Sequence, residues 1–214
     1  MSTIRILLGI FCLAAFGRSV EPSSGFLRFE VKAESLKVKA ESEKVKVESE
    51  KVKAESEKVK VESEKVKVEQ VNRNKIITIA ISQLGVREAT GNNDGVQVEA
   101  FLKVTNLPKG NPWCAAFVSW VFKEAGFTKP RTAWSPALFP LARLTLTPKP
   151  ADVLGIYSIK LKRIAHCGLV ERRQNNWIIS IEGNTNLDGS REGDGVYRKW
   201  RHIRTISKFA DWVK

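Results

Sequence analysis

Cys114 is the residue whose sequence surroundings most favour chemistry. It follows a turn rich in Gly and Pro at residues 110–112 and stands where a helix over residues 114–125 is expected to begin. The apolar face of that helix would repeat at helical spacing through Phe117, Val118, Val121, Phe122 and Ala125. Unpaired backbone N–H groups and the dipole at a helix N-terminus favour the thiolate, which is the nucleophilic form of cysteine. Alone, the segment is more typical of a small thiol buried in a core, so the assignment depends on partner residues.

A thiol nucleophile needs a base and a group that orients that base. His166 lies within residues 164–171, which the sequence pattern predicts to be a strand. A polar stretch follows, and then a second predicted strand at residues 177–182, so the two form a hairpin. If this hairpin is symmetric about Gln174, His166 faces Glu182. Directly opposed side chains share a face of the sheet and lie close enough to interact.

Asn184, two residues beyond Glu182, returns to the same face if the extended conformation persists. A carboxylate and an amide beside an imidazole can fix its tautomer and stabilise its charged form. The alternative is that His166 and Glu182 form an ordinary cross-strand pair at a sheet edge. The second histidine, His202, has no acidic neighbour close in sequence and is expected to be a surface residue of a basic strand.

Three stretches occur in a distinctive order and spacing. They are residues 112–118 (Pro-Trp-Cys-Ala-Ala-Phe-Val), the His-x-Gly-x-Val strand that His166 opens, and residues 182–184 (Glu-Gly-Asn). Together they resemble the CHAP domain, the cysteine, histidine-dependent amidohydrolases/peptidases of bacterial cell walls, which have a papain-like fold. Residues 85–88 and 91–95 look typical of one CHAP subgroup, and residues 150–153 resemble the family's Pro-Gly-Asp-Val segment with Ala151 in place of glycine. The resemblance covers roughly residues 76 to 213.

This resemblance implies a role for each candidate residue. Cys114 would be the nucleophile, His166 the general base, Glu182 the acid that orients it, and Asn184 a further polar member of the site. The implied reaction is hydrolysis of an amide bond in peptidoglycan, either the sugar–peptide amide or a bond of the stem or cross-bridge peptide, through a thioester. Trp113 and Trp134 could line the substrate groove or could fill the core. No cofactor is implied.

Cys167 departs from the family pattern, in which the position after the histidine is commonly aliphatic. Strand alternation is expected to point Cys167 away from the face that carries His166. We therefore expect a small core residue that is poorly placed to bond Cys114, and we predict no Cys114–Cys167 disulfide.

The polar run Asn92, Asn93 and Asp94 could suggest calcium, which some CHAP domains bind. A single carboxylate is a thin supply of ligands for that ion. A turn followed by a helix cap is expected instead, and no metal site is predicted.

Residues 1–20 have the pattern of a secretory signal peptide, with Arg5 before a short apolar run over residues 6–16. That run is too short to span a bilayer, which needs about twenty residues. An uncleaved anchor is the alternative. The expected location is therefore outside the cell or in the periplasm and cell envelope. The two cysteines left after cleavage do not imply a disulfide framework.

Residues 21–71 form a low-complexity spacer with a seven-residue repeat of the type Lys-Val-Lys-Val-Glu-Ser-Glu. Its apolar positions do not match the spacing of a coiled-coil seam, and an odd period flips the faces of a strand at every repeat. Pairs such as Lys44 with Glu48 lie at i,i+4 and would modestly support a lone helix. We predict a solvated stalk, helical or disordered, without a catalytic role.

Positive charge is concentrated in residues 71–214, which contain 22 Lys and Arg against 11 Asp and Glu, a net charge of +11. Composition alone would permit nucleic-acid binding. With an export signal, however, anionic envelope polymers or lipid head groups are the expected partners besides peptidoglycan, and nucleic acid is not. A solubilising surface with no specific target is the alternative. The protein is expected to be a monomer.

Residues 72–214 are expected to form one CHAP-like catalytic domain of the α+β class, with N-terminal helices packed on an antiparallel sheet. Asn74 is expected to cap a first helix and Asp94 a second. The second helix would turn Val98, Phe101 and Leu102 inward. Strands are expected at residues 153–159, 164–171, 177–182 and 195–203, and a short helix at residues 206–213 closes the chain.

Two other functions fit the same sequence. One is a secreted, non-catalytic module that binds wall or polyanion from a stalk, which the basic charge and the oxidation of an exposed thiol would favour. The other keeps the catalytic residues but directs them at an amide outside the wall.

Overall fold

The structure is a computed structural model that describes residues 24–187 and 193–214. The expected signal peptide, residues 1–20, lies outside these ranges. The chain divides into two compact units, residues 1–59 and residues 60–214. Within the described ranges no helix is both long and apolar enough to cross a membrane.

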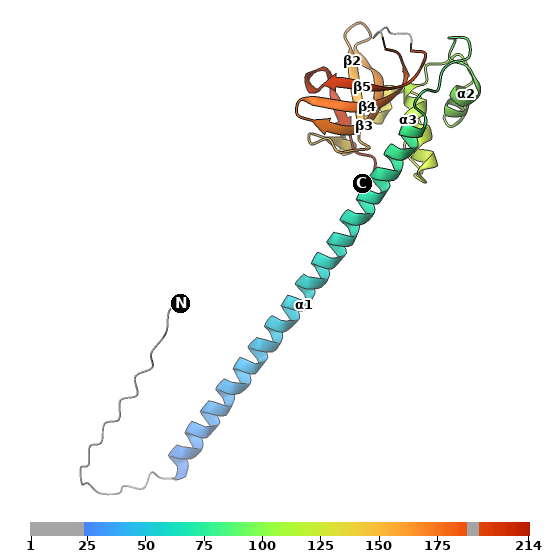
Figure 1. Cartoon of the computed structure of the whole chain (residues 1–214). Coiled ribbons are helices and arrows are strands. Elements are labelled where there is room, and N and C mark those ends of the chain that lie inside the picture. The colour runs from blue at the N-terminus through green and yellow to red at the C-terminus, as the bar shows by residue number, and fades with distance from the viewer. Residues whose placement is uncertain (1–23, 188–192) are drawn as a thin grey trace, which may run out of the picture. The chain divides into compact units, whose positions relative to one another are not determined.

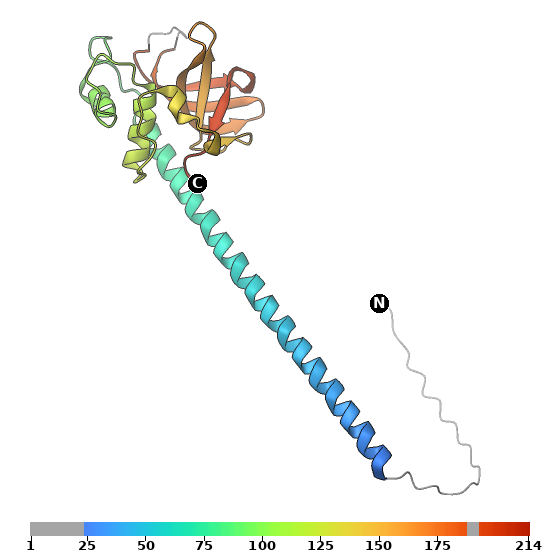
Figure 2. The same cartoon turned by 180° about the vertical axis from the view of Figure 1, so that it is seen from behind.

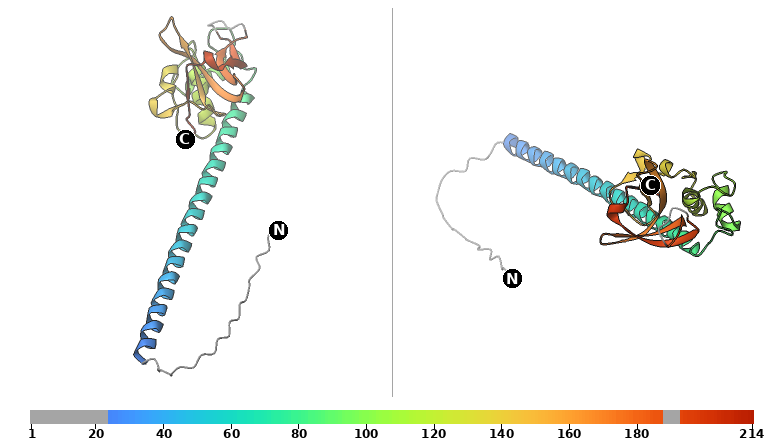
Figure 3. Two further views of the ribbon diagram at one scale, coloured as in Figure 1. Left: turned by 90° about the vertical axis from the view of Figure 1, so that its left-hand side faces the viewer. Right: turned by 90° about the horizontal axis from the view of Figure 1, so that it is seen from above.

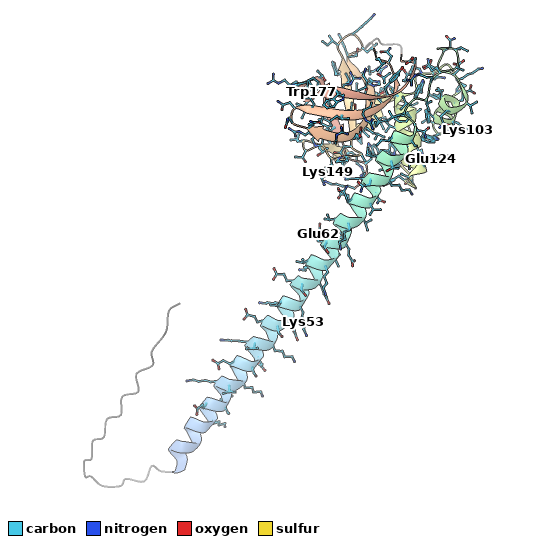
Figure 4. The ribbon with its side chains drawn as sticks, in the orientation of Figure 1. Lys53, Glu62, Lys103, Glu124, Lys149 and Trp177 are labelled. Carbon is cyan, nitrogen blue, oxygen red and sulfur yellow. The ribbon has the colours of Figure 1, made fainter. Side chains whose placement is uncertain are left out.

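The described part of the first unit is helical and belongs to α1 (Ser24–Ser82). All side chains between residues 34 and 59 are exposed to solvent, and Lys53 projects outward in Figure 4. One serine in each repeat donates a hydrogen bond to the carbonyl three residues before it, as Ser42 does to Lys39 and Ser49 to Lys46, each at 2.8 Å. Of the two predicted states of the spacer, the structure has the helix.

The separate helix expected to begin at Asn74 is wrong, because α1 runs through this position to Ser82. No Gly or Pro occurs between residues 26 and 84 to end the helix. Asn74 Oδ1 accepts a hydrogen bond of 2.8 Å from Gln70 one turn earlier instead of capping a new helix. The expected stop is confirmed, since Gly85 follows with a φ of 90°.

Arg73 anchors α1 within the second unit, and its side chain is buried. The guanidinium donates to Asp152 (Nη1–Oδ1, 2.8 Å), to Asp211 (Nη2–Oδ2, 2.5 Å) and to Glu69 (Nε–Oε1, 2.8 Å). Asp152 and Asp211 are also buried. Each of these charges is removed from water and therefore depends on its partners.

The second unit contains one six-stranded antiparallel sheet with the strand order β1-β6-β2-β3-β4-β5. The strands are β1 (Leu144–Thr145), β2 (Val153–Ser158), β3 (Arg163–Gln174), β4 (Trp177–Thr185), β5 (Gly195–His202) and β6 (Lys208–Ala210). The further views in Figure 3 show the twist of this sheet. The predicted strands are confirmed as β2 to β5, with ends that differ by a few residues.

Two short helices precede the sheet in the chain, α2 (Val96–Lys103) and α3 (Cys114–Glu124). Helix α3 packs against β3 and β4 and lies between α2 and the sheet (Figures 1 and 2). The remaining helical turns are η1 (Ser135–Leu138), η2 (Leu141–Arg143) and η3 (Ile203–Thr205). The predicted inward residues of α2, namely Val98, Phe101 and Leu102, are fully buried. Helices packed on an antiparallel sheet confirm the predicted α+β class.

Two further predicted elements are wrong. Helix α2 is preceded by Gly95 rather than capped by Asp94, whose carboxylate accepts hydrogen bonds from the backbone N–H and hydroxyl of Thr90 (2.9 and 2.7 Å). The helix expected at residues 206–213 is replaced by strand β6, which pairs with β2 and β1. Its consecutive buried residues fit a strand enclosed between two neighbours better than an amphipathic helix.

Substituting Arg73→Ala should destabilise the protein by about 3–5 kcal/mol, because it leaves two buried carboxylates without their cation. Lys149→Ala is the matched control. Lys149 pairs with Glu69 of the same network at 3.0 Å, but its side chain is 49% exposed, so its loss should cost less than about 1 kcal/mol. Urea unfolding of both variants checks this, and equal losses would contradict the buried anchor.

Candidate active site

Cys114 is the first residue of α3 and is 6% exposed. The preceding turn at residues 110–112 delivers the chain to the helix, and the apolar face of α3 is buried as predicted. At this position the Cys114 backbone N–H has no partner within the helix, as the first N–H groups of any helix do not. The thiol therefore lies at the positive end of a helix that the core holds in place.

The predicted pair of His166 and Glu182 is present. His166 Nε2 lies 2.8 Å from Glu182 Oε2, and Glu182 is fully buried. Two further residues hold the carboxylate. Ser180 donates to Oε1 at 2.6 Å, and Arg201 donates from Nε to Oε1 (2.9 Å) and from Nη2 to Oε2 (2.6 Å). A buried carboxylate with both oxygens bonded has one orientation, and this fixes the imidazole.

Sequence reasoning missed Arg201 and Ser180. Arg201 was part of a strand expected to be a basic surface. In the sheet, however, β5 pairs with β4, Arg201 lies opposite Ile178, and the long side chain reaches along this face to Glu182. The alternation of Ile178, Ser180 and Glu182 on one face of β4 was the available signal.

The register predicted for the hairpin is wrong by two residues. The ladder pairs Leu169 with Ile181, which continues to Gly168, and not His166, opposite Glu182. A shift of two residues preserves the face of every side chain. Glu182 therefore still shares a face with His166 and reaches it diagonally.

A β-bulge produces this match of faces. At the hairpin tip Gln174 pairs with Trp177, and an unbroken ladder from there would place Glu182 opposite Leu169, on the face that His166 does not share. The ladder shifts by one residue between Val170 and Arg172, leaving Glu171 unpaired. The extra residue brings the two catalytic candidates onto the same face.

Gly168 makes room for the carboxylate. A Cβ at this position would lie 2.5 Å from Glu182 Cγ and 3.1 Å from the carbonyl oxygen of Ile181. The Glu182 side chain therefore lies over Gly168, the position of β3 that has no side chain, and from there reaches His166.

The charges of the three groups are coupled. Burial alone would raise the pKa of Glu182, but hydrogen bonds from Arg201 and His166 hold it well below its usual range. Burial alone would lower the pKa of His166, but its hydrogen bonds with Cys114 and Glu182 raise it to about 10. The neighbouring Cys167 thiol, and then His166, outweigh burial and hold the pKa of Cys114 well below its usual range. These shifts favour a thiolate on Cys114 and an imidazolium on His166.

Cys167 is fully buried, as expected for a small core residue, but it lies close to Cys114, which the sequence did not predict. Both thiols contact Ser135 Oγ, Cys114 at 3.4 Å and Cys167 at 3.9 Å. Alternation turns Cys167 away from its neighbour His166 and so towards α3, which packs on this strand. Both cysteines are free thiols.

Asn184 is the last residue but one of β4, has a φ of 51° and lies in the same cleft as His166. Its side chain lies 2.7 Å from Asn93 and within 3.2 Å and 2.9 Å of the backbone and indole nitrogens of Trp113. It therefore ties the end of the strand to the start of α3, and no described hydrogen bond joins it to His166.

The predicted tryptophans lie in different environments. Trp113 is fully buried, and its indole donates to Glu88 Oε1 at 2.8 Å. The groove-lining role suggested for Trp113 is therefore wrong, and the core-filling alternative holds. Trp134 is 60% exposed and directly precedes Ser135, so its role in substrate binding stays a prediction.

A cleft of about 460 Å³ opens above Cys114 and His166. Its wall includes Lys160, Arg163 and Arg201. Arg201 is neutralised by Glu182, whereas Lys160 and Arg163 form no ion pair with any described residue. Among the described residues, no group of three or more His, Cys, Asp or Glu side chains could hold a metal ion.

The rate of Cys114 alkylation by iodoacetamide should stay nearly constant from about pH 8 down to about pH 6. An ordinary thiol loses roughly tenfold for each unit below its pKa, because only the thiolate reacts. His166→Ala should restore that ordinary slope, and Cys167, buried with a raised pKa, should stay unlabelled. Peptide mass mapping over time measures both thiols. Equal labelling of the two, or an ordinary slope in the unaltered protein, would contradict the ion pair.

Gly168→Ala should displace Glu182 and move the midpoint of the Cys114 alkylation profile towards that of an ordinary thiol. Gly155→Ala is the matched control, because its Cβ would press on the Phe139 ring at 2.6 Å instead. Both variants should lose about 1–3 kcal/mol of stability through overpacking, but only the first should change the profile. An unchanged profile in Gly168→Ala would show that the Glu182 carboxylate does not influence the ionisation of Cys114.

Comparisons with known proteins assign no family. No protein-family model matches the sequence, and no curated protein matches it. Among solved structures, the chain is similar to the NlpC/p60 domain of the peptidoglycan hydrolase SagA, at 14% identity and a TM-score of 0.40, over 65% of this chain and 97% of that one. It is also similar to the P60 domain of the M. avium paratuberculosis antigen MAP1272c, at 14% identity and a TM-score of 0.44, over 68% and 96%. The CHAP resemblance stays a prediction.

Proposed function

We propose that this protein is an exported cysteine hydrolase that cleaves amide bonds in peptidoglycan. The observation that carries the proposal is the arrangement of Cys114, His166 and Glu182 at one cleft. A thiol at a helix N-terminus, an imidazole beside it and a buried carboxylate behind that imidazole together meet the needs of nucleophilic catalysis.

In the proposed reaction the Cys114 thiolate attacks the carbonyl carbon of the scissile amide. Negative charge then develops on the carbonyl oxygen, and the backbone N–H of Cys114 at the start of α3 is a donor for it. The His166 imidazolium transfers its proton to the amide nitrogen. The C–N bond breaks, the amine leaves, and the acyl group remains on Cys114 as a thioester.

Hydrolysis of the thioester uses His166 in the opposite sense. The imidazole, now neutral, removes a proton from water as the water oxygen attacks the thioester carbonyl. The C–S bond breaks, a carboxylic acid leaves, and the thiolate–imidazolium pair is restored. Glu182 keeps the imidazole oriented in both halves and stabilises its charged form.

Peptidoglycan as the substrate is supported by the sequence resemblance to CHAP domains and by the charge of the cleft. The stem peptides of peptidoglycan carry free carboxylates. Lys160 and Arg163 line the cleft and have no carboxylate partner among the described residues, so an anionic peptide would find complementary charge there. Export is supported by the pattern of residues 1–20, and the same basic charge fits additional contact with anionic envelope polymers.

Replacing Cys114 by Ala should abolish release of soluble fragments from purified peptidoglycan, because it removes the thiol that attacks the amide in the proposed reaction. His202→Ala is the matched control and should keep wild-type activity, since His202 lies at the end of β5 and does not line the cleft. Turbidity loss and mass spectrometry of the fragments measure the reaction. A free amino group on the first residue of the stem peptide, where it was joined to the sugar, indicates an amidase. Free amino groups at later positions of the peptides indicate an endopeptidase.

Retained lysis by the Cys114→Ala protein would overturn the mechanism. Wall binding without any released fragment, by a protein whose Cys114 has an ordinary alkylation profile, would favour the non-catalytic binding module.

A further inference from the structure

We propose that Cys167 and Ser135 form a buried hydrogen-bond chain that positions and stabilises the Cys114 thiolate, so that Cys167 is a positioning residue of the active site. The catalytic part of this inference rests on the proposed function. The hydrogen-bond chain itself can be tested through the reactivity of the Cys114 thiol alone, without any substrate.

The geometry gives the chain a direction. Cys167 Sγ donates to Ser135 Oγ at 3.9 Å, and Ser135 Oγ lies 3.4 Å from Cys114 Sγ. A hydroxyl has one proton to donate. A thiolate has none, so a contact between Ser135 and the Cys114 thiolate requires the hydroxyl to donate. Because the Ser135 oxygen accepts the hydrogen bond from Cys167, the Ser135 hydroxyl proton is free to be donated to the Cys114 thiolate.

Burial protects the chain from water. Cys114 is 6%, Ser135 4% and Cys167 0% exposed, so water competes little for these donors and acceptors. Ser135 is placed by the η1 turn, which packs against β3 and α3. The chain therefore joins three elements at the sulfur atom that reacts.

The two thiols have opposite tendencies, as this arrangement requires. Burial raises the pKa of Cys167 well above its ordinary value, and the negative charge of Cys114 adds to the effect. Cys167 therefore keeps its proton and remains a donor, while the lowered pKa of Cys114 favours its ionised form. Two similar groups in one pocket are thus separated into a nucleophile and a supporting donor.

Strand β3 supplies both sides of the site with consecutive residues. His166 bonds to Glu182 and lines the cleft together with Cys114, and Cys167, next in sequence, donates to Ser135. The aliphatic residue that is common at this position in CHAP domains would fill the same space without donating. The exchange for cysteine adds a donor and little volume.

The test is the pH profile of Cys114 alkylation in the full chain, with iodoacetamide as the probe. Cys167→Ala should raise the midpoint by about one unit, so that labelling near pH 6 slows by roughly tenfold. Cys167→Ser keeps an O–H donor and should restore most of the original profile. Ser135→Ala should shift the midpoint at least as far as Cys167→Ala, and the double variant should shift it no further than Ser135→Ala.

Leu169→Val is the control for packing. Leu169 lies two residues beyond Cys167 on the same face of β3 and is fully buried, so this change removes core volume without removing a donor. Its profile should equal that of the unaltered protein. The inference is overturned if Cys167→Ala leaves the midpoint unchanged, or if Cys167→Ser shifts it as far as Cys167→Ala does.

Catalysis supplies an independent measurement. With peptidoglycan fragments as substrate, Cys167→Ala should lower kcat near pH 6 and leave KM unchanged, because the chain touches the nucleophile and not the substrate. Should no variant or native protein hydrolyse these fragments while the alkylation shifts remain, the proposed function fails and the hydrogen-bond chain stands. Hydrolysis with unshifted profiles would instead overturn the hydrogen-bond chain and support the proposed function.

Discussion

The structure of the site depends on one buried negative charge, the carboxylate of Glu182. It has no contact with solvent, and such a charge is tolerable only when its hydrogen-bonding capacity is met. Ser180 and Arg201 supply three of its bonds and His166 the fourth. Because Arg201 already neutralises the carboxylate, the positive charge of the His166 imidazolium is available to stabilise the Cys114 thiolate. The charges alternate in sign from Arg201 to the sulfur, and each step fixes the orientation of the next.

The parts of this arrangement that are local in sequence could be predicted. A turn rich in Gly and Pro before an apolar helical repeat places Cys114 at a helix start, whatever the rest of the fold does. Two strands joined by a short polar stretch place His166 and Glu182 on neighbouring strands. The α+β class follows in the same way from helical segments that precede strands. These predictions needed only periodicity and chain order.

The parts that depend on distant residues could not be predicted. Arg201 reaches Glu182 only because β5 pairs with β4, and the charge of that strand alone suggested a surface. The side of β3 that α3 covers decides whether Cys167 meets Cys114, and alternation alone does not reveal it. Arg73 likewise finds Asp152 and Asp211 far along the chain. Asn74 was an acceptable helix cap by type, but a long helix without a breaker passed through it.

Because Glu171 is the extra residue of a β-bulge, substituting it and deleting it should affect this hairpin differently. Replacing this side chain removes its ion pairs with Arg172 and Arg198 but leaves the number of residues in β3, and so the register, unaltered. A point deletion there removes the residue that offsets the ladder by one and turns Glu182 to the far side of the sheet from His166. A substitution and a deletion at this residue would thus have different effects on the site, although the residue touches no part of the reaction.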